Sequence, residues 1–160
     1  MRILGIDPGS RFTGWGLLQK HGNRNAYLCS GAVRLDPRCA LAERLVTLAE
    51  RIEALLAEHR PDHCAIEQIF SAKYVRSALV LGHARGVVLC TVARRGIALH
   101  EYSPTQVKQA VTGVGRASKG QVQQMVRMLL GERQVFQEDE ADALAVALTH
   151  AAAARGVFPR

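Results

Sequence analysis

The chain has 160 residues, of which 48% are hydrophobic and 22% charged, so we expect one compact domain over residues 1–160. Its 21 Lys and Arg residues exceed its 14 Asp and Glu residues, and the net charge of +7 favours a polyanionic partner such as nucleic acid. The first residues, MRILGID, carry no long apolar segment, and no apolar run reaches about 18 residues, so we expect neither secretion nor a membrane span.

The first part of the chain predicts strands. Residues 1–6 are mostly aliphatic and end at Asp7, where a Pro-Gly turn follows. Two further strands are expected over 13–20 and 25–35, joined by a hairpin connection at HGN. Three consecutive strands pair most simply as antiparallel neighbours.

The rest of the chain alternates helices and strands. Helical spacing of apolar residues and short apolar runs predict, in order, a helix over 39–59, a strand over 63–68, a helix over 77–96, a strand over 97–103, and helices over 104–111, 118–131 and 140–156. Strands separated by helices add in parallel through right-handed crossovers. We therefore expect an α/β fold with a five-stranded mixed sheet and helices on both faces.

The four cysteines, Cys29, Cys39, Cys64 and Cys90, include no CxxC pair and lie in or beside apolar patterns. A disulfide scaffold would place them in the loops of a smaller chain. We expect four reduced thiols in the core of a cytoplasmic protein.

Asp7 has two interpretations. Its carboxylate either accepts hydrogen bonds from the turn that follows it or holds a ligand in a cleft. If the strand over 63–68 lies parallel to the first strand, Glu67 reaches the same edge of the sheet as Asp7. Two such acids raise each other's pKa unless a cation offsets their charge.

The segment QEDEADALAVALTH begins a helix with Glu138, Asp139, Glu140 and Asp142. Acids in a first helical turn are favoured by the helix dipole and by capping, which accounts for Glu138 and Asp139 without any further role. Asp142 lies beyond the first turn and three residues after Asp139, on the same face of the helix. Its position is explained less well by capping.

One donor set combines these acids: Asp7, Glu67, Asp139 and Asp142. Carboxylate oxygens without a nearby His or Cys cluster suit a hard cation such as Mg²⁺ or Mn²⁺ rather than zinc. Two such ions about 4 Å apart activate a water and stabilise the leaving oxygen in phosphodiester hydrolysis. The sequence therefore predicts a metal-dependent nuclease.

Five segments extend this pattern through nearly the whole chain: GIDPGSRFTGWG, AIEQIFSAK, SALVLGHARG, QVKQAVTGVGRASKGQVQQMV and ADALAVALTHA. In this order and spacing they resemble the RuvC family of Holliday-junction resolvases. The resemblance implies a ribonuclease H-like fold and a magnesium-dependent crossover junction endodeoxyribonuclease that makes paired, symmetric nicks with ligatable ends. It also implies a homodimer and branch-migration partners of the RuvA and RuvB type.

The resemblance places a two-ion metal centre on Asp7, Glu67, Asp139 and Asp142. Some relatives carry histidine at the position of Asp139. Glu138 and Glu140 flank Asp139 here, so a neighbour that shares its role is left open.

Aromatic and basic side chains follow Glu67, and we expect DNA contacts from Phe70, Lys73, Tyr74 and Arg76. A ring can stack on any unpaired base while neighbouring cations hold phosphates. The alternative for Phe70 is a plug against the core, whereas the resemblance implies a wedge at the junction centre.

A second basic segment, VGRASKGQVQ, predicts a helix start at Ser118, capped reciprocally with Gln121. Lys119 at a helix N-terminus suits a phosphate, although lysines there are commonly only solvated. The resemblance implies functional lysines at Lys108 and Lys119, with a catalytic role for Lys119. We add Arg116 to the expected DNA contacts.

The remaining histidines are expected outside the acidic site. His150 follows Asp139 by eleven residues, about 16 Å along a helix, which is too far for a shared ion. His83 and His100 are interpreted as structural residues.

The helix over 77–95 is apolar around much of its circumference, and Gly82 and Gly86 leave a smooth strip along it. Other helices of the same chain can cover this surface, or a second copy can. Two symmetric cuts in a four-way junction require two sites related by a two-fold axis, which favours the homodimer.

Three other functions were compared with junction cleavage. The segment DPGSRFTG is also similar to the phosphate loop of actin-like and sugar-kinase ATPases, but these need a duplicated core that 160 residues cannot hold. A binding module without chemistry would repel DNA phosphates with its own acids unless they bind metal. A nuclease for RNA or linear duplex DNA is the nearest alternative.

Overall fold

The structure is a computed structural model that describes residues 1–68 and 75–154, with the side chains of residues 75 and 76 excepted. Three expected DNA contacts, Phe70, Lys73 and Tyr74, therefore lie outside the described residues, as does the side chain of Arg76.

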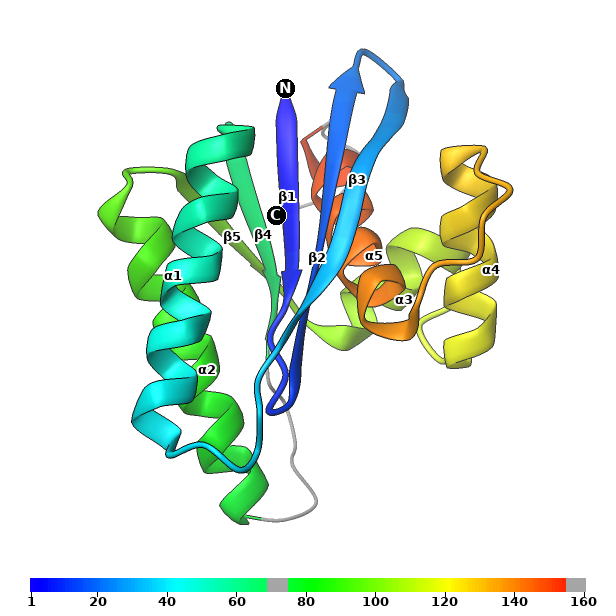
Figure 1. The fold of residues 1–160 in the computed structure, drawn as a ribbon. Helices are drawn as coiled ribbons and strands as arrows, with labels where there is room; N and C mark the ends of the chain where they lie inside the picture. Colours follow the sequence, from blue (N-terminus) through cyan, green and yellow to red (C-terminus); the bar gives the residue numbers. More distant parts are fainter. Residues whose placement is uncertain (69–74, 155–160) are drawn as a thin grey trace.

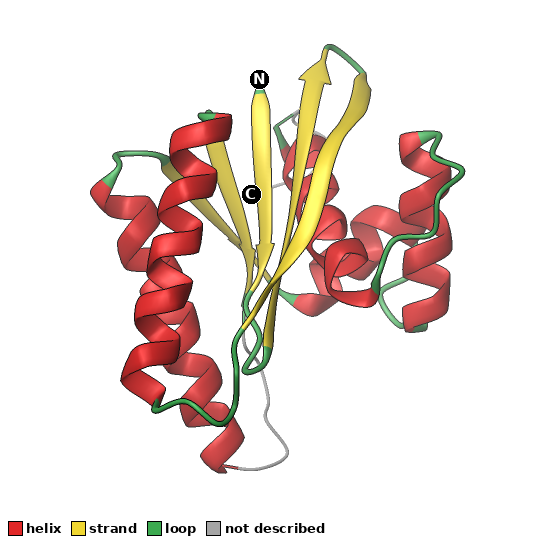
Figure 2. Cartoon of the chain, in the orientation of Figure 1, coloured by secondary structure: helices red, strands yellow, loops and turns green. Residues whose placement is uncertain are grey.

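Five strands form one sheet in the order β3-β2-β1-β4-β5. Their bounds are β1 Arg2–Asp7, β2 Phe12–His21, β3 Arg24–Arg34, β4 His63–Glu67 and β5 Ala98–Tyr102. β1 is antiparallel to β2 and β2 to β3, whereas β1, β4 and β5 run parallel. The mixed sheet is confirmed, and Figure 2 shows helices on both of its faces.

Two helices, α1 (Leu41–His59) and α2 (Val75–Arg94), cover one face of the sheet. The other three, α3 (Pro104–Thr112), α4 (Lys119–Leu130) and α5 (Glu138–Ala153), lie on the opposite face (Figure 1). Each face has its own apolar core: Leu48 and Val88 belong to the first, and Val126 and Leu144 to the second. The helix starts are set locally. Ser118 and Gln121, for instance, form the reciprocal cap predicted for α4.

The contact between α5 and the sheet is unusually close because glycines line it. A Cβ atom added to Gly14 would overlap with the carbonyl oxygen of Asp139, and one added to Gly16 would overlap with Leu144. Gly5 faces the backbone of α5 in the same way. These absent side chains set the height of α5 above β1 and β2.

The core prediction for the cysteines is wrong at two positions. All four thiols are free, with Cys64 buried and Cys29 half-buried, but Cys39 and Cys90 are exposed. Cys39 precedes α1, and Cys90 lies on a side of α2 that faces away from the sheet core. Neighbouring apolar residues do not reveal which side of a helix a residue occupies.

The described part of α2 is long and apolar enough, by length and composition alone, to cross a membrane, and 22% of the segment Ser77–Arg94 is buried. A single helix of this kind is weak evidence for a membrane span, because core helices of other proteins pass the same test. Much of its apolar surface is uncovered in the single chain.

Candidate active site

Three elements bring the predicted acids to one end of the sheet. Asp7 ends β1 and Glu67 ends β4, and the parallel register pairs Ile6 with Ile66 immediately before them. Asp139 and Asp142 lie at the start of α5, which packs across β1 and β2. Strand alternation turns Glu67 to the same face of the sheet as Ala65, which packs in the core under α5. The acids therefore gather where the start of α5 meets the strand ends.

Asp7 lies at the centre of this group. Loss of hydration, together with the charges of Glu67, Asp142 and Asp139, raises its pKa to about 8, while Lys119 opposes them. Carboxylates this close repel one another, so a bound cation would lower the free energy of the folded state. The site has the electrostatic character of a cation-binding centre.

Glu67 and Asp142 share this environment. Burial raises the pKa of Glu67, with Asp142 adding to the effect, while Lys108 and Lys119 lower it. Burial also raises the pKa of Asp142, against the hydrogen bond that Lys119 donates to it. The two acids and both lysines line one pocket, whose apolar wall includes Val107 and Val122.

Lys119, the first residue of α4, reaches over the start of α5. Its Nζ donates to Asp142 Oδ2 at 2.9 Å and also to Glu138 Oε1. Burial opposes the charge of Lys119, but the acceptors on Asp142 and Glu138 outweigh burial and raise its pKa. The side chain is half exposed, so it offers a permanent positive charge at the mouth of the pocket.

The two glutamates beside Asp139 have other contacts. Glu138 pairs with Lys119, and Glu140 accepts a hydrogen bond from the backbone N–H of Gln137 at 3.3 Å, which caps α5. Asp139 itself lies close enough to Asp7 to raise its pKa.

Of the remaining predicted DNA contacts, Arg116 is exposed in the connection between α3 and α4. It lines a pocket with Gln121 and Met125 of α4, and this pocket is separate from the one that Glu67, Asp142 and the two lysines line.

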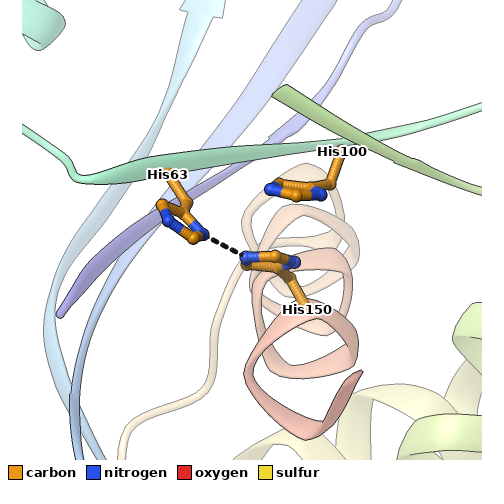
Figure 3. A group of neighbouring side chains, drawn as sticks. All are labelled: His63, His100 and His150. Carbon is orange, nitrogen blue, oxygen red and sulfur yellow. Dashed lines mark hydrogen bonds between the residues drawn. The ribbon is translucent and has the colours of Figure 1, made fainter. Parts of the chain in front are cut away.

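One cluster was missed from the sequence. His63, His100 and His150 meet beneath the C-terminal part of α5, with ligand nitrogens all within 4.8 Å of one another (Figure 3). His150 does stay apart from the acids, as expected. His83 is exposed on α2 of the single chain, and its structural interpretation stays a prediction. Strand alternation places His63 and His100 on the α5 side, but only the β4–β5 register shows that they are neighbours.

Comparisons with known proteins agree with this geometry. The family model described as "Crossover junction endodeoxyribonuclease RuvC" matches residues 3–150. A protein of that name from Heliobacterium modesticaldum is 51% identical over 149 residues, covering 92% of each chain. One from Syntrophotalea carbinolica is 50% identical over 151 residues, covering 94% of each.

The solved structures agree as well. The Thermus thermophilus RuvC structure in complex with a Holliday junction substrate superposes with a TM-score of 0.92 at 36% identity, covering 98% of this chain and 96% of that one. The same protein in another structure gives a TM-score of 0.88 over 98% of this chain. Sequence and fold thus agree, and the chain belongs to the RuvC family of crossover junction endodeoxyribonucleases.

Proposed function

We propose that this protein cleaves four-way DNA junctions by metal-dependent hydrolysis, making paired, symmetric nicks with ligatable ends. The observation that carries the proposal is the convergence of Asp7, Glu67, Asp139 and Asp142 at one end of α5, where their charges raise the pKa of Asp7. The Thermus thermophilus relative, seen with a Holliday junction substrate, supports the choice of substrate.

The donor set fits a hard divalent cation. Every candidate ligand is a carboxylate oxygen, which suits Mg²⁺, with Mn²⁺ as a substitute. Burial and the negative charge of neighbouring acids raise the pKa of Asp7, and Lys119 offsets that charge only in part. When bound, two such ions supply an activated water and charge stabilisation at the leaving oxygen.

Asp139 is the best third acid of this centre. Glu138 is already paired with Lys119, and Glu140 caps the helix through Gln137, so neither side chain is free to replace it without losing that contact. Asp139 shares the start of α5 with Asp142 and interacts electrostatically with Asp7.

The lysines prepare the pocket for a phosphate. Lys119 remains charged and its side chain is half exposed, so it can turn from Glu138 toward a non-bridging phosphate oxygen. Lys108 lines the same pocket and binds the adjacent phosphate backbone of the DNA.

Further DNA contacts are proposed outside this pocket. Arg116 binds the backbone, and Phe70, Lys73, Tyr74 and Arg76 approach the junction centre, where Phe70 stacks on an unpaired base.

A homodimer through α2 would supply two sites for two cuts. Cβ atoms added to Gly82 and Gly86 meet no atom of the described residues within 4 Å, and Leu79 is 60% exposed, so a second backbone can approach this strip closely. The two-fold axis of the dimer would match the symmetry of the substrate. We further propose that the dimer acts in the cytoplasm with branch-migration proteins of the RuvA and RuvB type.

The test uses three substrates: a synthetic four-way junction, a linear duplex of matched sequence and an RNA–DNA hybrid, each with Mg²⁺ or with EDTA. We expect paired nicks in the junction, resealed by DNA ligase, and only when Mg²⁺ is present. Equal cleavage of the linear duplex or the hybrid would replace the proposal with a general nuclease. Cleavage in EDTA would contradict the proposed dependence on a divalent metal.

A further inference from the structure

A second group of potential metal ligands lies at the far end of α5 from the acids. His63 begins β4, His100 lies in β5, and His150 lies in the last turns of α5. Their ligand nitrogens all lie within 4.8 Å of one another, and Figure 3 shows the three rings gathered between the two strands and the helix. The rings of His100 and His150 stack at a centroid distance of 4.1 Å. Three elements that are distant in sequence thus contribute one ring each.

Hydrogen bonds orient the buried member of the group. His150 is 3% exposed, its Nδ1 lies 2.7 Å from Tyr102 Oη, and its Nε2 lies 2.7 Å from His63 Nδ1. When Nδ1–H donates to Tyr102, the lone pair of Nε2 points at His63. A metal-bound histidine usually donates the N–H of its other ring nitrogen to a hydrogen-bond partner. This bond fixes the tautomer and leaves the first nitrogen free to bind the ion.

His100 contributes an unexplained nitrogen. Its Nε2 is buried and has no hydrogen-bond partner among the described residues. A buried polar atom without a partner costs free energy, and native structures rarely keep one without a reason. A metal ion between the rings would give this nitrogen a partner.

Two of the three rings favour the neutral form. Burial, together with His100, His63 and Lys20, lowers the pKa of His150 to about 4, and burial and His63 lower the pKa of His100. Neutral imidazole is the form that binds metals. The ammonium of Lys20 donates to Ala151 O at 2.7 Å. Its positive charge repels a cation, so electrostatic attraction alone would not hold an ion here. The occupant must therefore form strong bonds to nitrogen, which excludes Mg²⁺ and favours Zn²⁺ or a similar ion.

We propose that His63, His100 and His150 form a binding site for a borderline-soft divalent transition metal such as Zn²⁺, separate from the carboxylate centre. A tetrahedral ion with nitrogens about 2.0–2.1 Å away separates them by about 3.4 Å. The His63–His150 pair opens from 2.7 Å and the longer separations close slightly, with water as the fourth ligand. The ion links β4 and β5 to the end of α5, so its binding stabilises the fold.

The test is calorimetric titration of the full-length protein with Zn²⁺, with excess Mg²⁺ present to compete for the proposed carboxylate centre. We expect about one Zn²⁺ per chain, at least tenfold weaker binding in His100→Gln and in His63→Gln, and no change in His21→Gln, at the exposed end of β2. Zn²⁺ should raise the melting temperature of the wild type and of His21→Gln, but not of His100→Gln.

Two further variants separate this site from other ligands. Asp7→Asn and the pair Cys39→Ser with Cys90→Ser should bind Zn²⁺ as the wild type does. The two cysteines are exposed thiols that could bind Zn²⁺ on their own. Loss of binding in either of these variants, or unchanged binding in His100→Gln, would overturn the proposal. His100→Gln serves as the main variant because His100 is less buried than His150, and far-ultraviolet circular dichroism confirms its fold.

Discussion

The two ends of α5 pack on the same face of the same sheet, but one end gathers carboxylates and the other gathers imidazole rings. At its start, burial and neighbouring acids raise the pKa values of Asp7, Glu67 and Asp142. At its end, two imidazoles and the Tyr102 hydroxyl hydrogen-bond to one another. His63 and Glu67 lie only four residues apart on β4, but His63 belongs to the group at the end of α5 and Glu67 to the group at its start. Asp142 and His150 are about 12 Å apart along the helix. The comparison shows like charges gathered where chemistry is expected, and hydrogen-bonded rings beside one unpartnered nitrogen of His100, among the described residues, where the end of the helix packs on the sheet.

The largest effect is expected from the acidic end. Asp7→Asn or Glu67→Gln should lower junction cleavage by about 10³-fold or more, because each removes charge from the proposed metal centre. Junction binding should persist, and in the absence of metal it should tighten as repulsion of phosphates falls. Nicking and gel-shift assays on one preparation measure both, with Glu50→Gln on the exposed side of α1 as the control. Near-normal nicking would remove the altered acid from the site.

The imidazole end should respond in stability. His150→Ala removes a buried ring and two hydrogen bonds and should lower the free energy of unfolding by about 2 to 4 kcal/mol. The matched variant His21→Ala, at the exposed end of β2, should stay within about 0.5 kcal/mol of the wild type. Urea unfolding followed by circular dichroism measures the difference. Equal stability of the two variants would mean that the end of α5 is not anchored there.

Lys119 tests whether the positive charge at the acidic end acts on the substrate. Lys119→Met should reduce cleavage by about 10- to 100-fold, with Lys119→Arg retaining more activity, because the charge and not the amine supports the phosphate. Rates at saturating junction separate this effect from weaker binding. If a higher junction concentration fully restores the cleavage rate, Lys119 contributes to substrate binding and not to the chemical step.

The smallest effect concerns stability at the acidic end. There a substitution should stabilise the folded chain, whereas His150→Ala at the other end should destabilise it. The folded-state pKa of Asp7 is about 8, above its ordinary value of 3.8, so the folded chain binds a proton that the unfolded chain releases. Stability should therefore fall as pH rises between these values. In EDTA, Asp7→Asn should gain stability over the wild type as pH rises, reaching about 1 to 2 kcal/mol near pH 8. Melting temperatures at pH 5 and pH 8 provide the measurement, and a variant that is less stable at pH 8 would contradict it.

The acidic end could be predicted from the sequence because each of its signals is local. Asp7 and Glu67 each follow a short apolar strand, and the parallel arrangement of those strands follows from the helices between them. Asp139 and Asp142 share a helix face through their spacing, and the family resemblance joined all four acids.

The imidazole end could not be predicted in this way. His63, His100 and His150 meet only through the β4–β5 register and the position of α5 over both strands, which depend on tertiary packing. The same dependence accounts for Cys90, since the apolar sequence of α2 does not show which of its sides lies against the sheet. The proposed roles of Phe70 and its neighbours stay predictions.

The close approach of α5 to the glycines of the sheet has a genetic consequence. Gly14 pairs with Asp7 across β1 and β2 and lies directly beneath the backbone of Asp139. An alanine at position 14 lifts the start of α5 and moves two of the acids away from the other two, without touching a functional group. A screen for inactive alleles should therefore recover position 14 alongside the acids themselves.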